Sequence, residues 1–445
     1  MMRKVTVFVL AIMLVAPLVF SAGAREEPPA SIRVGTVRAI ASTRVAEKSS
    51  EFTEKTGIQV TVEQLTYPDL LTKIRIESVG NTGYYDIIRI GSGGIQGVSE
   101  PGWVLPLNDY IEKSGFDIDD WSQSLLDMVT DSDGNILAIP MDANIFMLAY
   151  RTDLFEDPDE KAAFKAKYGY DLAPPKTTDE WLEIAEFFTR DTTGDGENDL
   201  FGFGIGQRVP EHVYWPMYMG WTFGSELFDD DAIESRFNNE KTKAAFEWML
   251  EMQKFQPPGI LGVAYKEEEI LFRQGKLAMA PIFFTMAMDV IDPEKSDVHD
   301  RVAFTTFPAA PGSGNEIGQM HLGGGTLSIH SQSRNPDAAW EFLAWLFSRE
   351  TSMEMAKLGT VTPRNSLMGS EQLFEIVPEY GMFFPAYAAQ LDKGMRLRPS
   401  VPESSAIIEQ WGNAWHAVVQ GQKSIDRAMA DTCNEVTRIL TEAGY

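Results

Sequence analysis

The chain has 445 residues, 44% of them hydrophobic and 23% charged, a composition typical of a folded globular protein with two or three domains. Its 38 Lys and Arg and 65 Asp and Glu residues give a formal net charge of −27, which disfavours nucleic acids and anionic lipid surfaces as partners and favours a neutral ligand. A single cysteine, Cys433, excludes an internal disulfide.

The N-terminus has the pattern of a secretory signal peptide in residues 1–24. Two cations precede an almost unbroken apolar run over residues 5–20, and small residues follow at positions 22–24. A membrane anchor is the alternative, but the run is shorter than the roughly 20 apolar residues that span a bilayer. No cysteine follows the run to carry a lipid, so we expect a protein released into the periplasm.

The next stretch predicts a parallel sheet covered by helices. Strands are expected at residues 32–37, 58–62 and 86–90, with helices between them at 44–56 and 68–79. In such sheets, ligands bind beyond the carboxyl ends of the strands. Arg38 and Ser92 each follow a predicted strand and are therefore candidate binding residues, although an ion pair is the alternative role for Arg38.

The rest of the chain is predominantly helical. One helix is expected within residues 176–189, with Thr178 or Asp179 as its cap, and others at 241–255, 336–347, 406–419 and 424–440. Four tryptophans recur at helical spacing with other apolar residues and are predicted to lie in the core. They are Trp181, Trp248, Trp340 and Trp345.

Residues 191–202 have some features of a calcium-binding loop. Gly196 stands at the sharp turn, and the expected oxygen ligands are Asp191, Thr193, Asp195, Glu197 and Asp199. Thr193 replaces the usual acidic or amide residue, and Gly202 cannot supply the closing carboxylate. A turn capped by its own Asp side chains is therefore the alternative to a structural calcium site.

Four segments resemble the family 1 extracellular solute-binding proteins, the sugar-capturing subunits of bacterial ABC importers, which include maltose-binding and polyol-binding proteins. They are residues 84–111 (YYDIIRIGSGGIQGVSEPGWVLPLNDYI), 134–155 (GNILAIPMDANIFMLAYRTDLF), 272–284 (FRQGKLAMAPIFF) and 323–350 (GGGTLSIHSQSRNPDAAWEFLAWLFSRE). The order and separations of the segments carry the resemblance, which covers nearly all of the mature chain.

The resemblance implies an α/β fold of the two-lobed periplasmic-binding-protein type, in which each lobe is a mainly parallel sheet flanked by helices. Lobe 1 is expected to comprise residues 25–142 and 324–362, and lobe 2 residues 143–323 and 363–445. The chain then crosses a hinge near residues 142–144, 322–324 and 362–364.

The implied function is capture of a neutral mono- or oligosaccharide, or of a polyol, by hinge closure and delivery to an ABC-transporter permease. No cofactor is required, and we expect a monomer.

A sugar site needs flat side chains that stack on C–H faces and polar groups that bond hydroxyls. Trp103, Trp215 and Trp221 lie in loop-like segments outside the helical stripes and are cleft candidates, with core burial as the alternative. The resemblance adds Trp411, in a helix that skirts the cleft in the family, with core burial beside Ile407, Ile408 and Trp415 as the alternative. It also adds the stacking candidates Phe283 and Phe284.

The resemblance also points to polar and backbone contacts. Asp142 and Asn144 lie at the first expected crossing, where the family often has a sugar-contacting residue. Gly323 and Gly324 are expected to expose backbone to the ligand or to let the lobes approach closely. Arg364 is a candidate hydrogen-bond donor, with an ion pair as the alternative.

Known catalytic motifs are not present in the sequence. It has no GxSxG, HExxH or Walker A pattern, and GSGGIQG lacks the spacing of a dinucleotide fingerprint. Chance pairs among 65 acidic residues leave a carbohydrate-active enzyme as one alternative, and a periplasmic sugar receptor for signalling is another.

Overall fold

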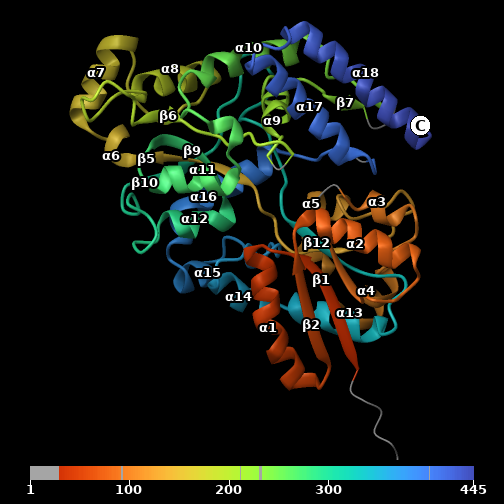
Figure 1. The fold of residues 1–445 in the computed structure, drawn as a ribbon. Helices are drawn as coiled ribbons and strands as arrows, with labels where there is room; N and C mark the ends of the chain where they lie inside the picture. Colours follow the sequence, from red (N-terminus) through yellow and green to blue (C-terminus); the bar gives the residue numbers. More distant parts are fainter. Residues whose placement is uncertain (1–29, 92–93, 211, 230–232, 400) are drawn as a thin grey trace, which may run out of the picture.

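The computed structural model describes the chain except for residues 1–29, 92–93, 211, 230–232 and 400. The predicted signal peptide and Ser92 therefore lie outside the described residues. Two large sheets, each with its own helices, form an upper and a lower lobe (Figure 1). Among the helices of the described segments, none is both long and apolar enough to cross a membrane.

The sheet of the first lobe has the strand order β2-β1-β3-β12-β4. As predicted, β1 (Ser31–Val37) pairs in parallel with β2 (Gln59–Leu65) and β3 (Ile87–Gly91). β12 (Gly325–Ile329) runs antiparallel to both β3 and β4 (Ile139–Pro140). The sheet is mixed because β12 enters from the second lobe at the carboxyl end of β3.

Helices α1 (Ile40–Thr56) and α13 (Pro336–Leu346) pack together on this sheet. Between them, the Phe52 ring lies 5.1 Å from that of Phe342 and 5.3 Å from that of Trp345. Trp345 itself is only half-buried, because it lies at the margin of this core. Helix α2 (Tyr67–Val79) begins at Thr66, whose hydroxyl accepts a hydrogen bond from the Asp69 amide.

The sheet of the second lobe has the order β10-β5-β9-β6. β5 (Phe146–Arg151) runs antiparallel to β10 (Val302–Thr305) and β9 (Leu277–Phe283), while β6 (Phe201–Phe203) is parallel to β9. The expectation of a mainly parallel sheet is wrong for this lobe. β5 departs from the hinge and β9 returns toward it, so these neighbours run in opposite directions.

Helix α8 (Thr178–Phe188) covers this sheet, and its cap lies one residue before the earlier of the two predicted caps, Thr178 and Asp179. The cap is Thr177, whose hydroxyl accepts from the Glu180 amide while the Glu180 carboxylate accepts from the Thr177 amide. This reciprocal capping box requires an acidic residue three positions after the cap, which Thr177 has. The predicted core residues Trp181 and Trp248 are both buried here, and Trp340 is buried in α13.

The prediction of a loop around Trp215 and Trp221 is wrong. Residues Trp215–Thr222 form helix α9, with Pro216 in its first turn, and every residue of this helix is buried. A helix buried on all sides has no polar face, so the apolar periodicity that marks a surface helix is absent.

At the C-terminus, α17 (Ser404–Val419) and α18 (Ile425–Ala443) pack on each other, and α10 (Glu240–Gln253) contacts both α9 and α18. Trp411 is fully buried in α17, and its ring is parallel to that of Phe237 at 5.6 Å. Core burial, the alternative reading of Trp411, is the observed one.

Further helices and strands complete the two lobes. They are α3 (Gln96–Ser99), α4 (Asn108–Ser114), α5 (Gln123–Asp127), α6 (Thr152–Phe155), α7 (Pro158–Tyr168), α11 (Tyr265–Arg273), α12 (Phe284–Val290), α14 (Arg349–Lys357), α15 (Glu371–Ile376), α16 (Tyr380–Lys393), β7 (Phe228–Asp229), β8 (Glu234–Ser235), β11 (Met320–His321) and β13 (Met395–Arg396).

Candidate functional site

Two chain segments cross between the sheets and bond to each other. The Gly323 amide donates to the Asn144 carbonyl at 2.7 Å, and the Gly325 amide donates to the Asp142 carboxylate at 2.7 Å. Gly324 lies between them with a φ of 95°, and a Cβ there would overlap the Asp142 carboxylate. Close approach of the segments therefore requires glycine at this position.

Asp142 is buried, and its carboxylate holds the two crossing segments together by accepting the Gly325 amide. Burial raises its pKa, whereas the positive charge of Arg89 and the hydrogen bond from Gly325 act in the opposite direction. Asn144 is half-buried, and its side-chain oxygen accepts a hydrogen bond from the Thr285 amide at 3.2 Å. Both predicted polar residues thus lie at the junction of the lobes, where they fix the chain.

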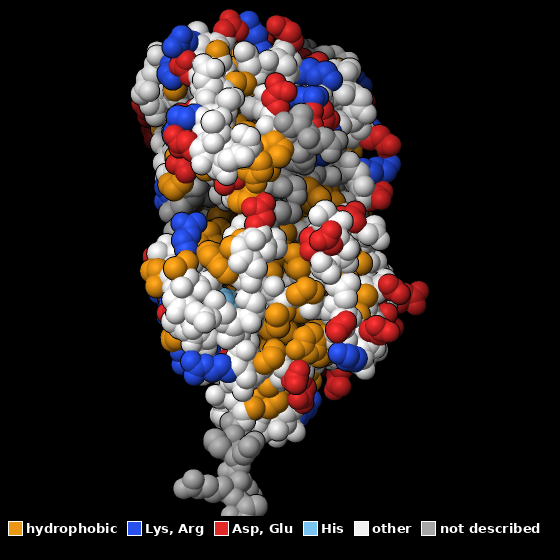
Figure 2. Space-filling model, turned by 90° about the vertical axis from the view of Figure 1, so that its right-hand side faces the viewer, with side chains coloured by type: hydrophobic (Ala, Val, Ile, Leu, Met, Phe, Trp, Pro, Cys, Tyr) orange, Lys and Arg blue, Asp and Glu red, His pale blue; other side chains and the backbone are white. Residues whose placement is uncertain are grey.

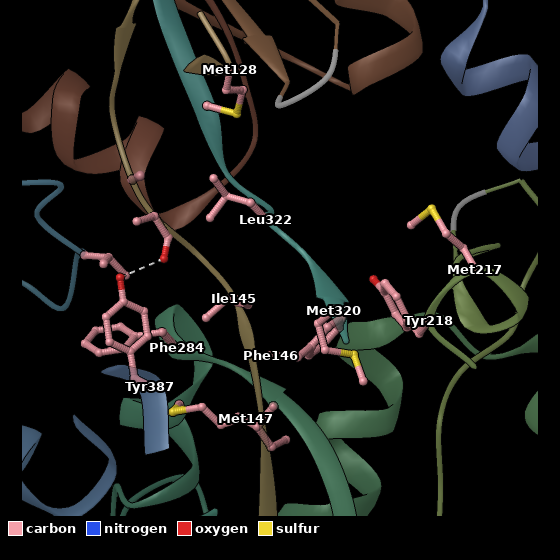
Figure 3. Close-up of a cluster of buried hydrophobic side chains, with 14 of the residues drawn as sticks. Met128, Ile145, Phe146, Met147, Met217, Tyr218, Phe284, Met320, Leu322 and Tyr387 are labelled. Atoms are coloured by element: carbon pink, nitrogen blue, oxygen red, sulfur yellow. Dashed lines mark hydrogen bonds between the residues drawn. The ribbon is translucent and has the colours of Figure 1, made fainter. Parts of the chain in front are cut away.

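The neighbouring phenylalanines Phe283 and Phe284 point to different environments. Phe283 is half-buried at the crossing, where its ring stacks on Phe146 at 3.6 Å. Phe284 is fully buried, with its ring 4.6 Å from that of Tyr387, whose hydroxyl donates to the Ala143 carbonyl at 2.9 Å (Figure 3). Phe284 therefore lies in the core, because consecutive residues at a strand end face opposite sides, and a ligand contact by Phe284 stays an untested prediction.

On the first lobe, Tyr67 and Arg89 lie at the carboxyl end of β3. A Cβ on Gly91 would lie 2.8 Å from the Tyr67 hydroxyl, and a Cβ on Gly325 would lie 2.5 Å from Cζ of Arg89. Burial raises the pKa of the Tyr67 hydroxyl, Arg398 and Arg89 lower it, and Tyr214 raises it further. Groups of both lobes thus meet around Tyr67.

The facing wall of the second lobe consists of flat side chains. The Tyr218 hydroxyl lies 2.6 Å from Nδ1 of His321, and the Tyr214 ring stacks on His321 at 4.6 Å. Burial lowers the pKa of His321 well below its usual value, so its ring is neutral near pH 7. The Arg398 guanidinium lies over Tyr214, 5.5 Å from the ring centroid.

A second buried pair, His212 and Glu268, lies behind this wall. The His212 ring is 6.1 Å from Phe146, and its Nδ1 is 3.7 Å from the Glu268 carboxylate. Burial lowers the pKa of His212 to about 3, so its ring is neutral near pH 7 and forms no ion pair with Glu268, whose pKa burial raises well above 4.5. Neither His212 nitrogen has a hydrogen-bond partner among the described residues.

The other predicted binding residues lie elsewhere or are occupied. Arg38 is exposed, and Trp103 is half-buried against the first-lobe core. Arg364 is buried, donates to Asp120 at 2.7 Å and lies over the Trp121 ring at 4.7 Å, so the ion pair is the observed role. Trp221 is 5% exposed, and Trp215 packs with Trp181, Phe203 and Trp248 at 6.0, 5.8 and 6.1 Å, so neither indole presents an open face.

The predicted calcium loop caps its own backbone. The Asp191 carboxylate accepts hydrogen bonds from the amides of Thr193, Gly194 and Gly196, and Asp199 accepts from Thr192. Within the described residues, no group of three or more His, Cys, Asp or Glu side chains is arranged to hold a metal ion. The arrangement fits the alternative turn, and calcium binding stays an untested prediction.

Sequence reasoning missed the residues that the fold brings together at the junction. These are Tyr67, Arg89, His212, Tyr214, Tyr218, Glu268, His321 and Arg398. One signal was available, because Arg89 is a charge within the otherwise apolar strand Ile87–Gly91, and buried charges require a specific reason. The others depend on contacts between distant segments.

Comparison with known proteins agrees with this architecture. The family model of bacterial extracellular solute-binding proteins matches residues 35–353. The chain is 24% identical over 378 residues to the mannitol-binding protein of Pseudomonas aeruginosa, with 82% of each chain covered. It is 23% identical over 432 residues to a probable amino-acid ABC transporter periplasmic-binding protein of Sinorhizobium fredii, with 92% of this chain and 90% of the relative covered.

Among solved structures, an ABC transporter solute-binding protein from Agrobacterium radiobacter K84 in complex with ribitol superimposes with a TM-score of 0.78. The two chains are 25% identical, and the match covers 92% of this chain and 98% of the other. The predicted two-lobed fold is confirmed, while the exact lobe boundaries stay a prediction. This chain belongs to the family of bacterial extracellular solute-binding proteins.

Proposed function

We propose that this protein captures a neutral sugar or polyol in the periplasm and delivers it to the permease of an ABC importer. One observation carries the proposal: Tyr67 and Arg89 of the first lobe lie close enough to Tyr214 and Arg398 of the second lobe for their charges to act on one another, beside the bonded crossing segments. Two relatives, with the ligands mannitol and ribitol in their names, support this class of solute.

The chemistry of these side chains suits a polyhydroxylated solute. Tyr214 and Phe283 offer partly exposed aromatic rings for C–H faces, while tyrosine hydroxyls and guanidinium groups donate hydrogen bonds to solute oxygens. His321 is 3% exposed and stacks on the rings of both Tyr214 and Tyr218, so it orients these tyrosines and does not itself offer a face to the solute.

Capture by closure follows from the two-lobed architecture. A solute that touches both walls binds the closed form more tightly than the open form, and this difference in affinity shifts the population toward closure. The crossing segments 141–145 and 322–325 are the parts of the backbone that flex. The closed form then docks on the permease, which supplies the passage through the membrane.

We further propose that the protein acts as a monomer, binds no nucleic acid and catalyses no reaction. The paired carboxylates that glycoside hydrolysis requires are not gathered among the side chains described at the junction, where Asp142 bonds the backbone and Glu268 lies behind Phe146. Residues 1–24 provide the export signal.

A melting-temperature screen tests the ligand class. Ribitol, D-mannitol, maltose and other sugars and polyols are compared with a matched panel of amino acids. A cognate polyol at ~100 times its Kd stabilises the native state by roughly 2.7 kcal/mol, which raises the melting temperature. Stabilisation by amino acids alone would overturn the proposal.

A further inference from the structure

We propose that Arg89 determines solute specificity by binding a pair of oxygen atoms of the solute, supplied by two adjacent hydroxyl groups or by a carboxylate. This inference rests on the function proposed above and assigns to that site a residue that lies within a strand rather than in a loop.

The first argument is that the Nε atom of Arg89 is buried without a hydrogen-bond partner. The residue is 8% exposed, and its Nε has no hydrogen-bond partner among the described residues. A guanidinium group stays charged in proteins, and a buried charge without hydrogen bonds is strongly unfavourable. An acceptor from outside the chain removes this penalty.

The second argument is that the neighbouring carboxylate, that of Asp142, already accepts a hydrogen bond from the backbone. Asp142 is the carboxylate whose charge state Arg89 influences, but no ion pair within 4 Å joins the two side chains. Its Oδ1 instead accepts the Gly325 amide at 2.7 Å. The chain therefore brings Arg89 close to Asp142 without giving its donors an acceptor there.

The third argument is the shape of the backbone around the guanidinium. Gly325 leaves room for it, because a Cβ there would lie 2.5 Å from Cζ of Arg89. Ile88 and Ile90, its neighbours in β3, are fully buried on the opposite face of the strand. The strand thus holds the long side chain along the sheet, toward the carboxyl end where the lobes meet.

The fourth argument is position relative to the second lobe. Tyr67 lies close enough to Arg89, Arg398 and Tyr214 for all three to affect its pKa. A solute at Tyr67 is therefore within reach of Arg89 on one side and of the second-lobe wall on the other. Contact with both lobes is what couples binding to closure.

The fork of a guanidinium group fits two oxygens at once, whereas a lysine ammonium is a single point of charge. Adjacent hydroxyls of a polyol and the two oxygens of a carboxylate share this spacing. Experiment decides between the two sources.

The experiment is calorimetric titration of the mature protein with ribitol and D-mannitol and with the matching acids, ribonate and mannonate. The variants are Arg89→Gln, which removes the charge, and Arg89→Lys, which keeps the charge but loses the fork. Arg75→Gln is the matched control, because Arg75 is an exposed residue of α2.

We expect both Arg89 variants to weaken binding of the preferred probe by roughly tenfold or more, since each loses a hydrogen-bonded pair to a charged group, while Arg75→Gln binds as the wild type does. Loss of polyol binding identifies adjacent hydroxyls. Tighter wild-type binding of the acid, with the preference lost in Arg89→Gln, identifies a carboxylate, and it replaces the neutral solute of the proposed function with an acidic one.

If both Arg89 variants bind the preferred probe with a Kd within about twofold of the wild-type Kd, the inference is overturned. The proposed function still stands in that case. If no polyol, sugar or acid binds the wild type, the proposed function fails, and the inference fails with it. A variant that is partly unfolded could bind weakly for that reason alone. For each variant, the ratio of the Kd of a polyol to that of its monodeoxy analogue is therefore compared, because this ratio does not depend on the folded fraction.

Discussion

The indole of Trp215 lies inside an aromatic cluster with Trp181, Phe203 and Trp248, so its main contribution is to stability. We expect Trp215→Ala to lower the free energy of unfolding by ~3 to 5 kcal/mol, because it leaves a large cavity in packed surroundings. Urea unfolding measures this change. The folded fraction is expected to keep the affinity for its solute, and weak binding with unchanged stability would return Trp215 to the binding site.

Glu268 makes stability depend on pH. Its carboxyl is fully buried beside Glu267, Glu269 and His212, and burial raises its pKa well above the usual 4.5. The unfolded chain releases this proton near pH 4.5, whereas the folded chain retains it. The stability contributed by the neutral carboxyl is therefore complete below about pH 4.5 and is lost as the pH rises toward the folded pKa.

Glu268→Gln keeps the shape of the side chain but cannot ionise. We expect the variant to gain stability relative to the wild type as the pH is raised from about 4.5 to about 8. Urea unfolding of both proteins at both pH values gives the difference in their free energies of unfolding. The stability contributed by His212 depends on pH in the opposite direction, but it is the same in both proteins and cancels in this difference. A difference between variant and wild type that does not change with pH would show that Glu268 is ionised in the folded protein.

At the scale of elements, the crossing segments depend on Gly324. Its φ is 95°, and a Cβ would overlap the Asp142 carboxylate, whereas Gly421 has a φ of 69° with open space around it. Alanine at either position carries the cost of a left-handed backbone, about 1 to 2 kcal/mol. We expect Gly324→Ala to lower the melting temperature more than Gly421→Ala and to change solute affinity as well, and equal effects would show that the crossing tolerates a Cβ.

The loop of residues 191–202 provides a second test at this scale. Its Asp191 and Asp199 carboxylates already accept amide hydrogen bonds from the loop. We expect a calcium chelator to leave the melting temperature unchanged, because the turn holds itself. A fall in melting temperature that added calcium reverses, and that Asp195→Ala abolishes, would establish the calcium site.

Elements with a clear period were predictable from the sequence. The alternating and apolar runs of β1 to β3 and the amphipathic helices were identified, with ends displaced by a few residues. Helix α9 was not identified, because all its residues are buried and no polar face marks it. β12 runs antiparallel to β3 because the chain enters it from the second lobe. The pattern of residues within the strand itself does not encode this path.

The site was less predictable than the fold for a physical reason. The segments around Asp142, Asn144, Gly323 and Gly324, which the family resemblance implied as crossings, bond to each other through backbone groups and the Asp142 carboxylate. The side chains that face one another come from distant parts of the chain, as with Tyr218 and His321. Tryptophan was expected in the cleft, yet Trp215, Trp221 and Trp411 are buried, and the partly exposed rings near the junction are those of Tyr214 and Phe283.

At the scale of the whole molecule, two lobes meet at bonded crossings, and apolar side chains gather near this junction (Figure 2). The net charge of −27 does not prevent capture of an uncharged solute, and arginines are nevertheless placed at the junction. The central claim is that a sugar or polyol bridges the two lobes and holds them closed.

Small-angle X-ray scattering with and without a saturating sugar or polyol tests this claim most directly. The solute is the one that raises the melting temperature most, and an amino acid at the same concentration is the control. We predict a smaller radius of gyration with the polyol and no change with the amino acid, because bridging contacts favour the closed form. Saturable polyol binding without compaction, or compaction with the amino acid alone, would contradict the account.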